Sequence, residues 1–268
     1  MRENVLKTFG RFSTLILWEL EKTFTFLMLA IITGAVFANS LPAYGGGVKS
    51  PSKMPTLTSI KGDFADGLVN GVSMNVVSSF VYVVIIFAAL TSSSLSRDIS
   101  MGYTRVLLSY PIERTKLLLS KILVLLFVPF SFFACSYLFG AALTYPSLFW
   151  HMPFLAVAYV LAAMLIQTFF IFAVSFSASL YIRHPVMSFL ASVVALIGTQ
   201  QVSNYLPEPY KYLLPTQGTH ALFGYYFYPG AFESQYVPVV VFPLIGMIVV
   251  PAVILVMNLV YFRWRFQT

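Results

Sequence analysis

Side chains that could carry out chemistry are few in this chain and lie far apart. The three histidines are His151, His184 and His220, and Cys135 is the single cysteine. The sequence has no phosphate-binding G-x-x-x-x-G-K-[ST] loop, no metal-binding H-E-x-x-H or C-x-x-C pair and no G-x-S-x-G nucleophile motif. We therefore expect no catalytic residue, metal site or cofactor in this chain itself, and we do not expect it to be an enzyme.

Small polar side chains form two stripes at helical spacing. The first comprises Asn75, Ser78, Ser79 and Tyr82, and the second comprises Ser188, Ser192, Thr199 and Ser203. Such residues either join helices by hydrogen bonds within a membrane or line a path for a substrate, and the sequence leaves both interpretations open. No predicted span carries Asp, Glu, Lys or Arg near its middle, which argues against a proton-coupled carrier.

The composition identifies the kind of element that must position these side chains. Of the 268 residues, 59% are hydrophobic and only 9% are charged, whereas a soluble domain has about 25% charged residues. So few charges cannot cover a water-facing surface, which excludes a cytosolic enzyme, a disulfide scaffold and a disordered protein. The sequence is that of an integral membrane protein.

Charge-free stretches long enough to cross a bilayer predict six transmembrane helices and an all-α fold. The predicted spans lie at about 24–42, 70–93, 117–143, 153–181, 185–203 and 237–262. With the connections assigned to alternate sides, twelve of the sixteen Lys and Arg residues fall on the side of the amino terminus. The positive-inside rule then predicts both termini in the cytoplasm and a multi-pass protein of the cell (cytoplasmic) membrane. Because this topology accounts for the net charge of +7, we expect contacts with membrane lipid and no nucleic-acid partner.

Two segments outside the spans have an unusual composition. In residues 2–22, apolar side chains recur at helical spacing, at Val5, Phe9, Phe12, Ile16 and Leu20. This pattern predicts an amphipathic helix in the cytoplasmic interface, with Trp18 at the level of the lipid headgroups, or alternatively a surface helix packed on protein. Residues 204–236 are rich in Tyr, Phe and Pro. They predict either half-helices that re-enter the outer leaflet or an ordinary external cap.

The connection between the second and third spans carries a family resemblance. Residues 96–121 read SRDISMGYTRVLLSYPIERTKLLLSK. They resemble the segment after the second span of ABC-2-type transporter permeases, the membrane subunits of type V ABC exporters, where the pattern is acidic-x-x-x-Gly-Thr, two leucines, Pro, a basic residue and Gly-Lys. The matching residues are Asp98, Gly102, Leu107, Leu108, Pro111, Arg114 and Lys121. The chain departs from the pattern by Asp98 in place of Glu, Tyr103 in place of Thr and Ser120 in place of Gly.

This resemblance implies an elbow helix at 2–22 and a coupling helix at about 95–109 that docks onto a separate ATPase subunit. We expect Gly102 to permit the close approach of a partner or of the elbow helix, and Pro111 to end the coupling helix. The turn at Arg183 is expected to supply a second, smaller contact. The residues expected to couple the chain to the ATPase are Arg97, Asp98, Gly102, Arg105, Pro111, Arg114, Lys121 and Arg183.

The resemblance also implies an assembly. Two ATPase subunits would bind ATP and Mg. A second permease copy, identical or related, would complete the path, which spans two and five line at the dimer interface. The residues expected along that path are Asn75, Ser78, Ser79, Tyr82, Ser188, Ser192 and Thr199. The predicted function is that of the permease subunit of an ATP-driven exporter. The alternatives are a membrane enzyme acting on a lipid or lipid-linked substrate, and a membrane anchor that transports nothing.

Overall fold

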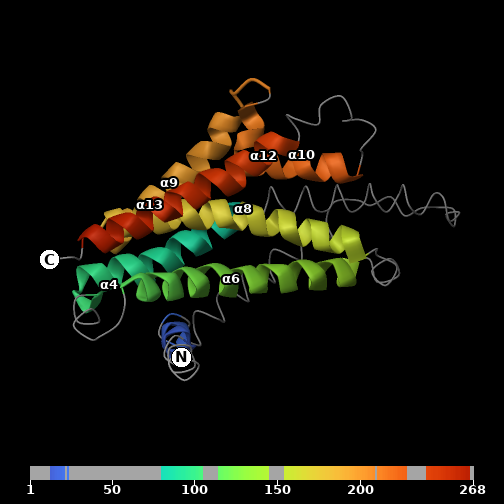
Figure 1. Ribbon diagram of the computed structural model, residues 1–268. Coiled ribbons are helices and arrows are strands. Elements are labelled where there is room, and N and C mark those ends of the chain that lie inside the picture. The colour runs from blue at the N-terminus through green and yellow to red at the C-terminus, as the bar shows by residue number, and fades with distance from the viewer. Residues whose placement is uncertain are drawn as a thin grey trace, which may run out of the picture.

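The fold was analysed in a computed structural model, which describes residues 13–21, 23, 80–104, 114–144, 154–208, 210–227 and 240–265. These residues form helices joined by short connections, and no strand occurs among them (Figure 1). Five helices are long and apolar enough to cross a membrane: Phe80–Ser100, Thr115–Cys135, Val157–Tyr181, Pro185–Ser203 and Phe242–Arg265. The described chain therefore has the architecture of an all-α, multi-pass membrane protein.

These five helices correspond to five of the six predicted spans. Their bounds agree closely for α8 (Phe154–Tyr181) and α9 (Pro185–Ser203), which follow the predicted ranges to within one residue. The first predicted span, at 24–42, and the beginning of the second lie outside the described residues. The second span continues beyond its predicted end near residue 93 and includes α4 (Arg97–Ser100).

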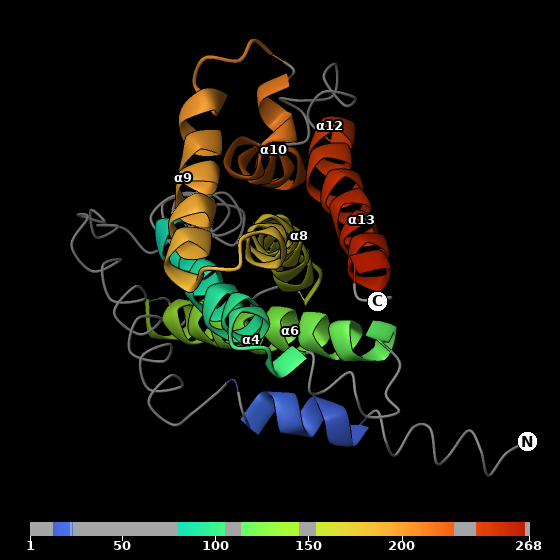
Figure 2. The same cartoon turned by 90° about the vertical axis from the view of Figure 1, so that its left-hand side faces the viewer.

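The long helix α8 lies at the centre of the bundle. It packs against α6 (Arg114–Thr144) on one side and against α9, α10 (Pro215–Phe227) and α13 (Val250–Arg265) on the other (Figures 1 and 2). Aromatic rings fill the space between the central helices. The Phe172 ring centroid lies 6.1 Å from that of Phe87 and 5.3 Å from that of Phe176. Because lipid tails are as apolar as these side chains, close packing stabilises the bundle more than apolar burial does.

Two of the spans contain a π-helical turn: η2 (Ser92–Ser96) and η6 (Ile245–Val249). In the turn before η2 and at its start, hydroxyl side chains compete for the backbone carbonyls. Thr91 Oγ1 donates to the Phe87 carbonyl at 2.7 Å, and Ser92 Oγ donates to the Ala89 carbonyl at 3.0 Å. Close after η6, Pro251 has no N–H to donate to the preceding turn. Both local causes favour a widened turn within an otherwise regular helix.

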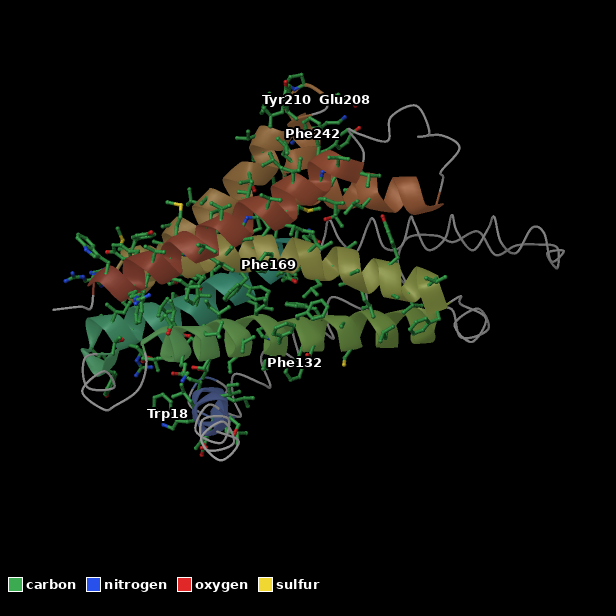
Figure 3. All side chains as sticks on the ribbon, viewed as in Figure 1. Trp18, Phe132, Phe169, Glu208, Tyr210 and Phe242 are labelled. Carbon is green, nitrogen blue, oxygen red and sulfur yellow. The ribbon has the colours of Figure 1, made fainter. Side chains whose placement is uncertain are left out.

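At one end of the bundle, the connection after α9 folds back onto the spans. It forms η3 (Tyr210–Leu213) and α10, and Tyr210 lies against Phe242 of α12 (Phe242–Leu244) with ring centroids 6.1 Å apart (Figure 3). With 13 residues, α10 is about 20 Å long, which is too short to cross a bilayer. Part of the 204–236 segment is therefore helical, at Pro215–Phe227, and residues 228–236 lie outside the described residues. That this helix re-enters the outer leaflet stays a prediction.

Residues 13–21, the described part of the predicted elbow helix, are helical and lie beside α6 on the side away from α8 (Figures 1 and 2). Ile16 packs against the core, whereas 66% of Leu17 and 38% of Trp18 are exposed. Figure 3 shows Trp18 outside the bundle. The helix therefore has one side on protein and exposed apolar side chains on another side. A position in the membrane interface stays a prediction.

Candidate functional site

The predicted coupling segment begins as a direct continuation of the second span. The helix ends at Ser100, where the Met101 N–H donates to the Arg97 carbonyl at 2.9 Å and the Gly102 N–H donates to the Ile99 carbonyl at 3.3 Å. Gly102 then has φ +76°, in the left-handed region that glycine adopts without strain. The predicted unbroken helix over 95–109 is therefore interrupted at Met101–Gly102. Residues 105–109, with Arg105, and Pro111 lie outside the described residues.

The backbone conformation at Gly102 favours glycine for a reason that we did not predict, whereas the approach of a partner to Gly102 stays a prediction. We expected its lack of a side chain to permit the close approach of a partner or of the elbow helix. A Cβ atom built at Gly102 would meet nothing within 4 Å in the described structure. The positive φ, rather than close packing within this chain, is what favours glycine at this position.

A hollow of about 450 Å³ opens at this end of the bundle. We call it the Met101 hollow, and its lining residues are Ile99, Ser100, Met101, Gly102, Arg183 and His184. Residues from the second span and from the α8–α9 turn thus form one surface, although they are about 80 positions apart in the sequence. The contact segment predicted from the family pattern and the predicted second contact at Arg183 are brought together here.

A partly buried hydrogen bond fixes the two sides of the Met101 hollow relative to each other. Ser96, which is fully buried, donates from Oγ to the Ile182 carbonyl at 2.7 Å. Beyond that carbonyl, His184 has an extended backbone and Pro185 begins α9, as expected for a residue that precedes proline. The turn is therefore short and held at both ends.

The surface around the Met101 hollow combines exposed apolar and basic groups. Met101 and Tyr103 are 56% and 51% exposed, and Arg97, Arg183 and His184 are exposed as well. Of these residues, Met101, Arg183 and His184 line the hollow. Methionine and arginine are enriched in surfaces that bind another protein.

Two of the predicted contact residues face the interior instead. Lys121 Nζ lies 2.8 Å from Asp98 Oδ2 and 2.8 Å from Glu19 Oε2, and each of the three side chains is at most 4% exposed. Asp98 and Lys121 are therefore not on the surface that a partner could touch. Arg114 begins α6, and its side chain is not among those described.

Glu19 is the residue of this cluster that sequence reasoning missed. It lies 102 positions before Lys121 and on a different helix. The available signal was its place on the predicted elbow helix, one residue after Trp18, where a carboxylate next to the membrane needs a partner.

The second polar stripe packs inside the chain. Ser188 and Ser192 are fully buried, and Ser188 Oγ lies 2.9 Å from Ser179 Oγ of α8. Half-buried Thr199 donates to its own helix, at 2.6 Å from the Leu196 carbonyl. For Ser188 and Ser192 this geometry favours helix packing over a path. Of the first stripe, Tyr82 is 51% exposed, and Asn75, Ser78 and Ser79 lie outside the described residues.

Within the described ranges, no group of His, Cys, Asp and Glu side chains is arranged to hold a metal ion. His184 belongs to the Met101 hollow, and His220 lies in α10, where burial lowers its pKa. His151 is outside the described residues, and Cys135 is exposed.

No protein-family model, curated protein or solved structure matches this chain. Its assignment as an all-helical, multi-pass membrane protein therefore rests on the five apolar helices themselves.

Proposed function

We propose that this chain is the transmembrane permease subunit of an ATP-driven exporter and that it acts as a dimer with two copies of a separate ATPase subunit. In this proposal the ATPase binds at the Met101 hollow, supplies the sites for ATP and Mg, and drives the movement of a substrate out across the membrane. The family resemblance of residues 96–121 supports the assignment, with its three departures from the family pattern.

The observation that carries the proposal is the convergence of two predicted contact segments in one hollow. The loop after the second span and the Arg183 turn were each predicted as contacts for the same partner, and both line the Met101 hollow. Its sides are the end of Phe80–Ser100 and the turn directly before α9, so a force applied there is passed on to two long helices. The Ser96–Ile182 hydrogen bond would make the two helix ends respond together.

The proposal is tested by co-expressing the chain with the P-loop ATPase encoded next to it and purifying the complex into lipid nanodiscs. The variant Met101→Glu/Arg183→Glu changes two side chains of the Met101 hollow that point outward, so it should fold normally. We expect the ATPase to co-purify with the wild type but not with this variant, and stimulated ATP hydrolysis to fall at least tenfold.

Arg263→Glu is the matched control, because Arg263 is an exposed arginine of α13 that does not line the Met101 hollow. It should retain both the complex and the stimulated hydrolysis. Equal binding by the wild type and the hollow variant would refute the proposed docking surface. Turnover of a lipid by the purified chain alone would favour the membrane-enzyme alternative, and a stable complex without substrate movement would favour the anchor.

A further inference from the structure

The buried ion cluster joins three segments that the sequence separates widely. We call Glu19, Asp98 and Lys121 the Lys121 triad. Glu19 comes from the elbow helix, Asp98 from the end of the second span and Lys121 from the first turns of α6. One ammonium group thus bridges two carboxylates, each at 2.8 Å.

The Lys121 triad should hold its three segments in fixed relative positions. An apolar contact tolerates small displacements, but a buried charge that loses its partner is strongly unfavourable. Glu19 Oε1 is buried and has no hydrogen-bond partner among the described residues, so the hold on the elbow helix depends on Oε2. Asp98 has a further interaction besides its bond to Lys121. The Glu19 arm is therefore the weaker of the two.

The position of Asp98 connects the Lys121 triad to the Met101 hollow. Asp98 immediately precedes Ile99, the first residue of the hollow, and is turned inward while Met101 is turned outward. Lys121 therefore supports the hollow from its inner side. On the other arm, Glu19 lies next to Trp18 and Leu20, whose exposed apolar surfaces fit the membrane interface.

We propose that Lys121 is a positioning residue that clamps the elbow helix to the inner side of the Met101 hollow. A displacement of the hollow is then transmitted to α6 and to the elbow helix as one unit. This inference rests on the proposed function for the source of that displacement. The clamp itself needs no partner. It affects the stimulation of ATP hydrolysis rather than the affinity for the ATPase.

The clamp is tested by a distance measurement on the full chain with spin labels at exposed Leu17 of the elbow helix and exposed Leu119 of α6, in a Cys135→Ser background. The wild type should give one narrow distance distribution. Lys121→Met should broaden it or add a longer distance, and Lys121→Arg should restore it.

A neutral triple variant, Glu19→Gln/Asp98→Asn/Lys121→Met, separates loss of the clamp from misfolding, because it leaves no buried charge uncompensated. A second label pair at Val186 of α9 and Val253 of α13 reports whether the rest of the bundle is intact. We expect the triple variant to keep the wild-type distance for this pair while the elbow distance broadens. An unchanged elbow distance in both Lys121→Met and the triple variant would overturn the clamp.

The consequence for coupling is measured on the complex with the ATPase. The triple variant should bind the ATPase within twofold of wild-type affinity, because the residues of the Met101 hollow are unchanged, while stimulated ATP hydrolysis falls about tenfold. Unchanged stimulation together with a broadened elbow distance would refute the coupling role. Failure of the wild type to bind any ATPase would instead refute the proposed function, and the distance measurement would still test the clamp.

Discussion

Among the glycines Gly102, Gly198, Gly218 and Gly246, the last leaves the least room for a side chain, and this predicts a large effect of a single methyl group where η6 meets the connection into α10. Gly246 faces the backbone of Leu213. A Cβ atom at Gly246 would lie 2.7 Å from both the carbonyl carbon and the Cα of Leu213, and closer still to the carbonyl oxygen. These are backbone atoms, so no change of side-chain rotamer can relieve the clash.

The size of the effect follows from these distances. Carbon atoms in ordinary contact are about 3.5–4.0 Å apart, so Gly246→Ala requires η6 and η3 to separate by about 1 Å. Overpacking of this kind costs about 1–3 kcal/mol. We expect the upper half of that range, because Leu213 continues into α10. There Gly218 already faces the Tyr212 carbonyl, with a Cβ position only 2.6 Å from that oxygen.

The assay is the unfolding free energy in detergent micelles, measured by titration with a denaturing detergent. Gly198→Ala is the matched control, since Gly198 also lies within a membrane helix but a Cβ there would meet nothing within 4 Å. Alanine is favoured over glycine in a helix by up to about 1 kcal/mol, so the control should be neutral or stabilising. Stabilities of the two variants that agree within about 0.5 kcal/mol would refute the reasoning.

Three further predictions use the same unfolding measurement. Gly102→Ala should cost about 1–2 kcal/mol because its φ of +76° is left-handed, and Gly102→Asn should cost less; equal costs would contradict the conformational explanation. Asn258 Nδ2 donates to Ser177 Oγ at 2.7 Å, so a double-mutant cycle of Asn258→Leu and Ser177→Ala should give a coupling of about 0.6 kcal/mol, and additivity would contradict it. Burial lowers the pKa of His220 below its ordinary 6.5, so the unfolded chain takes up the proton first and stability should fall as the pH drops from 7 to 5. His220→Gln should remove that part of the pH dependence, and an unchanged pH profile would rule out this histidine as its source.

The spans were predictable because length and hydropathy are local properties. The α8–α9 boundary was predicted closely because Arg183 and Pro185 mark it in the sequence. The end of the second span was placed too early, since Arg97 and Asp98 resembled the start of a solvated loop. Asp98 remains inside the bundle because Lys121 compensates its charge, and that pairing depends on tertiary structure.

The two surface segments of the candidate site could be predicted from the sequence, but the buried contacts behind them could not. The loop after the second span and the Arg183 turn were both expected at the partner surface, and the Met101 hollow unites them. The role of Glu19 could not be predicted, because its partner is 102 positions away and helical spacing carries no information at that range. For the serine stripe of α9, the sequence fitted packing and a path equally well, and only the contact between Ser188 and Ser179 distinguishes the two.

The widened turn at Ser92–Ser96 has a consequence for the length of the second span. A π-turn accommodates one residue more than an α-turn, so the helix after Ser96 is rotated by about 100° from the phase that a regular helix would have. If this turn became regular α-helix with no residue removed, Asp98 would be turned by about 100° away from Lys121, whereas deleting one serine would give a regular helix that leaves Asp98 in its present orientation. The π-turn thus sets the direction in which Asp98 points, and the span should tolerate the loss of one serine better than the insertion of a further residue into the run.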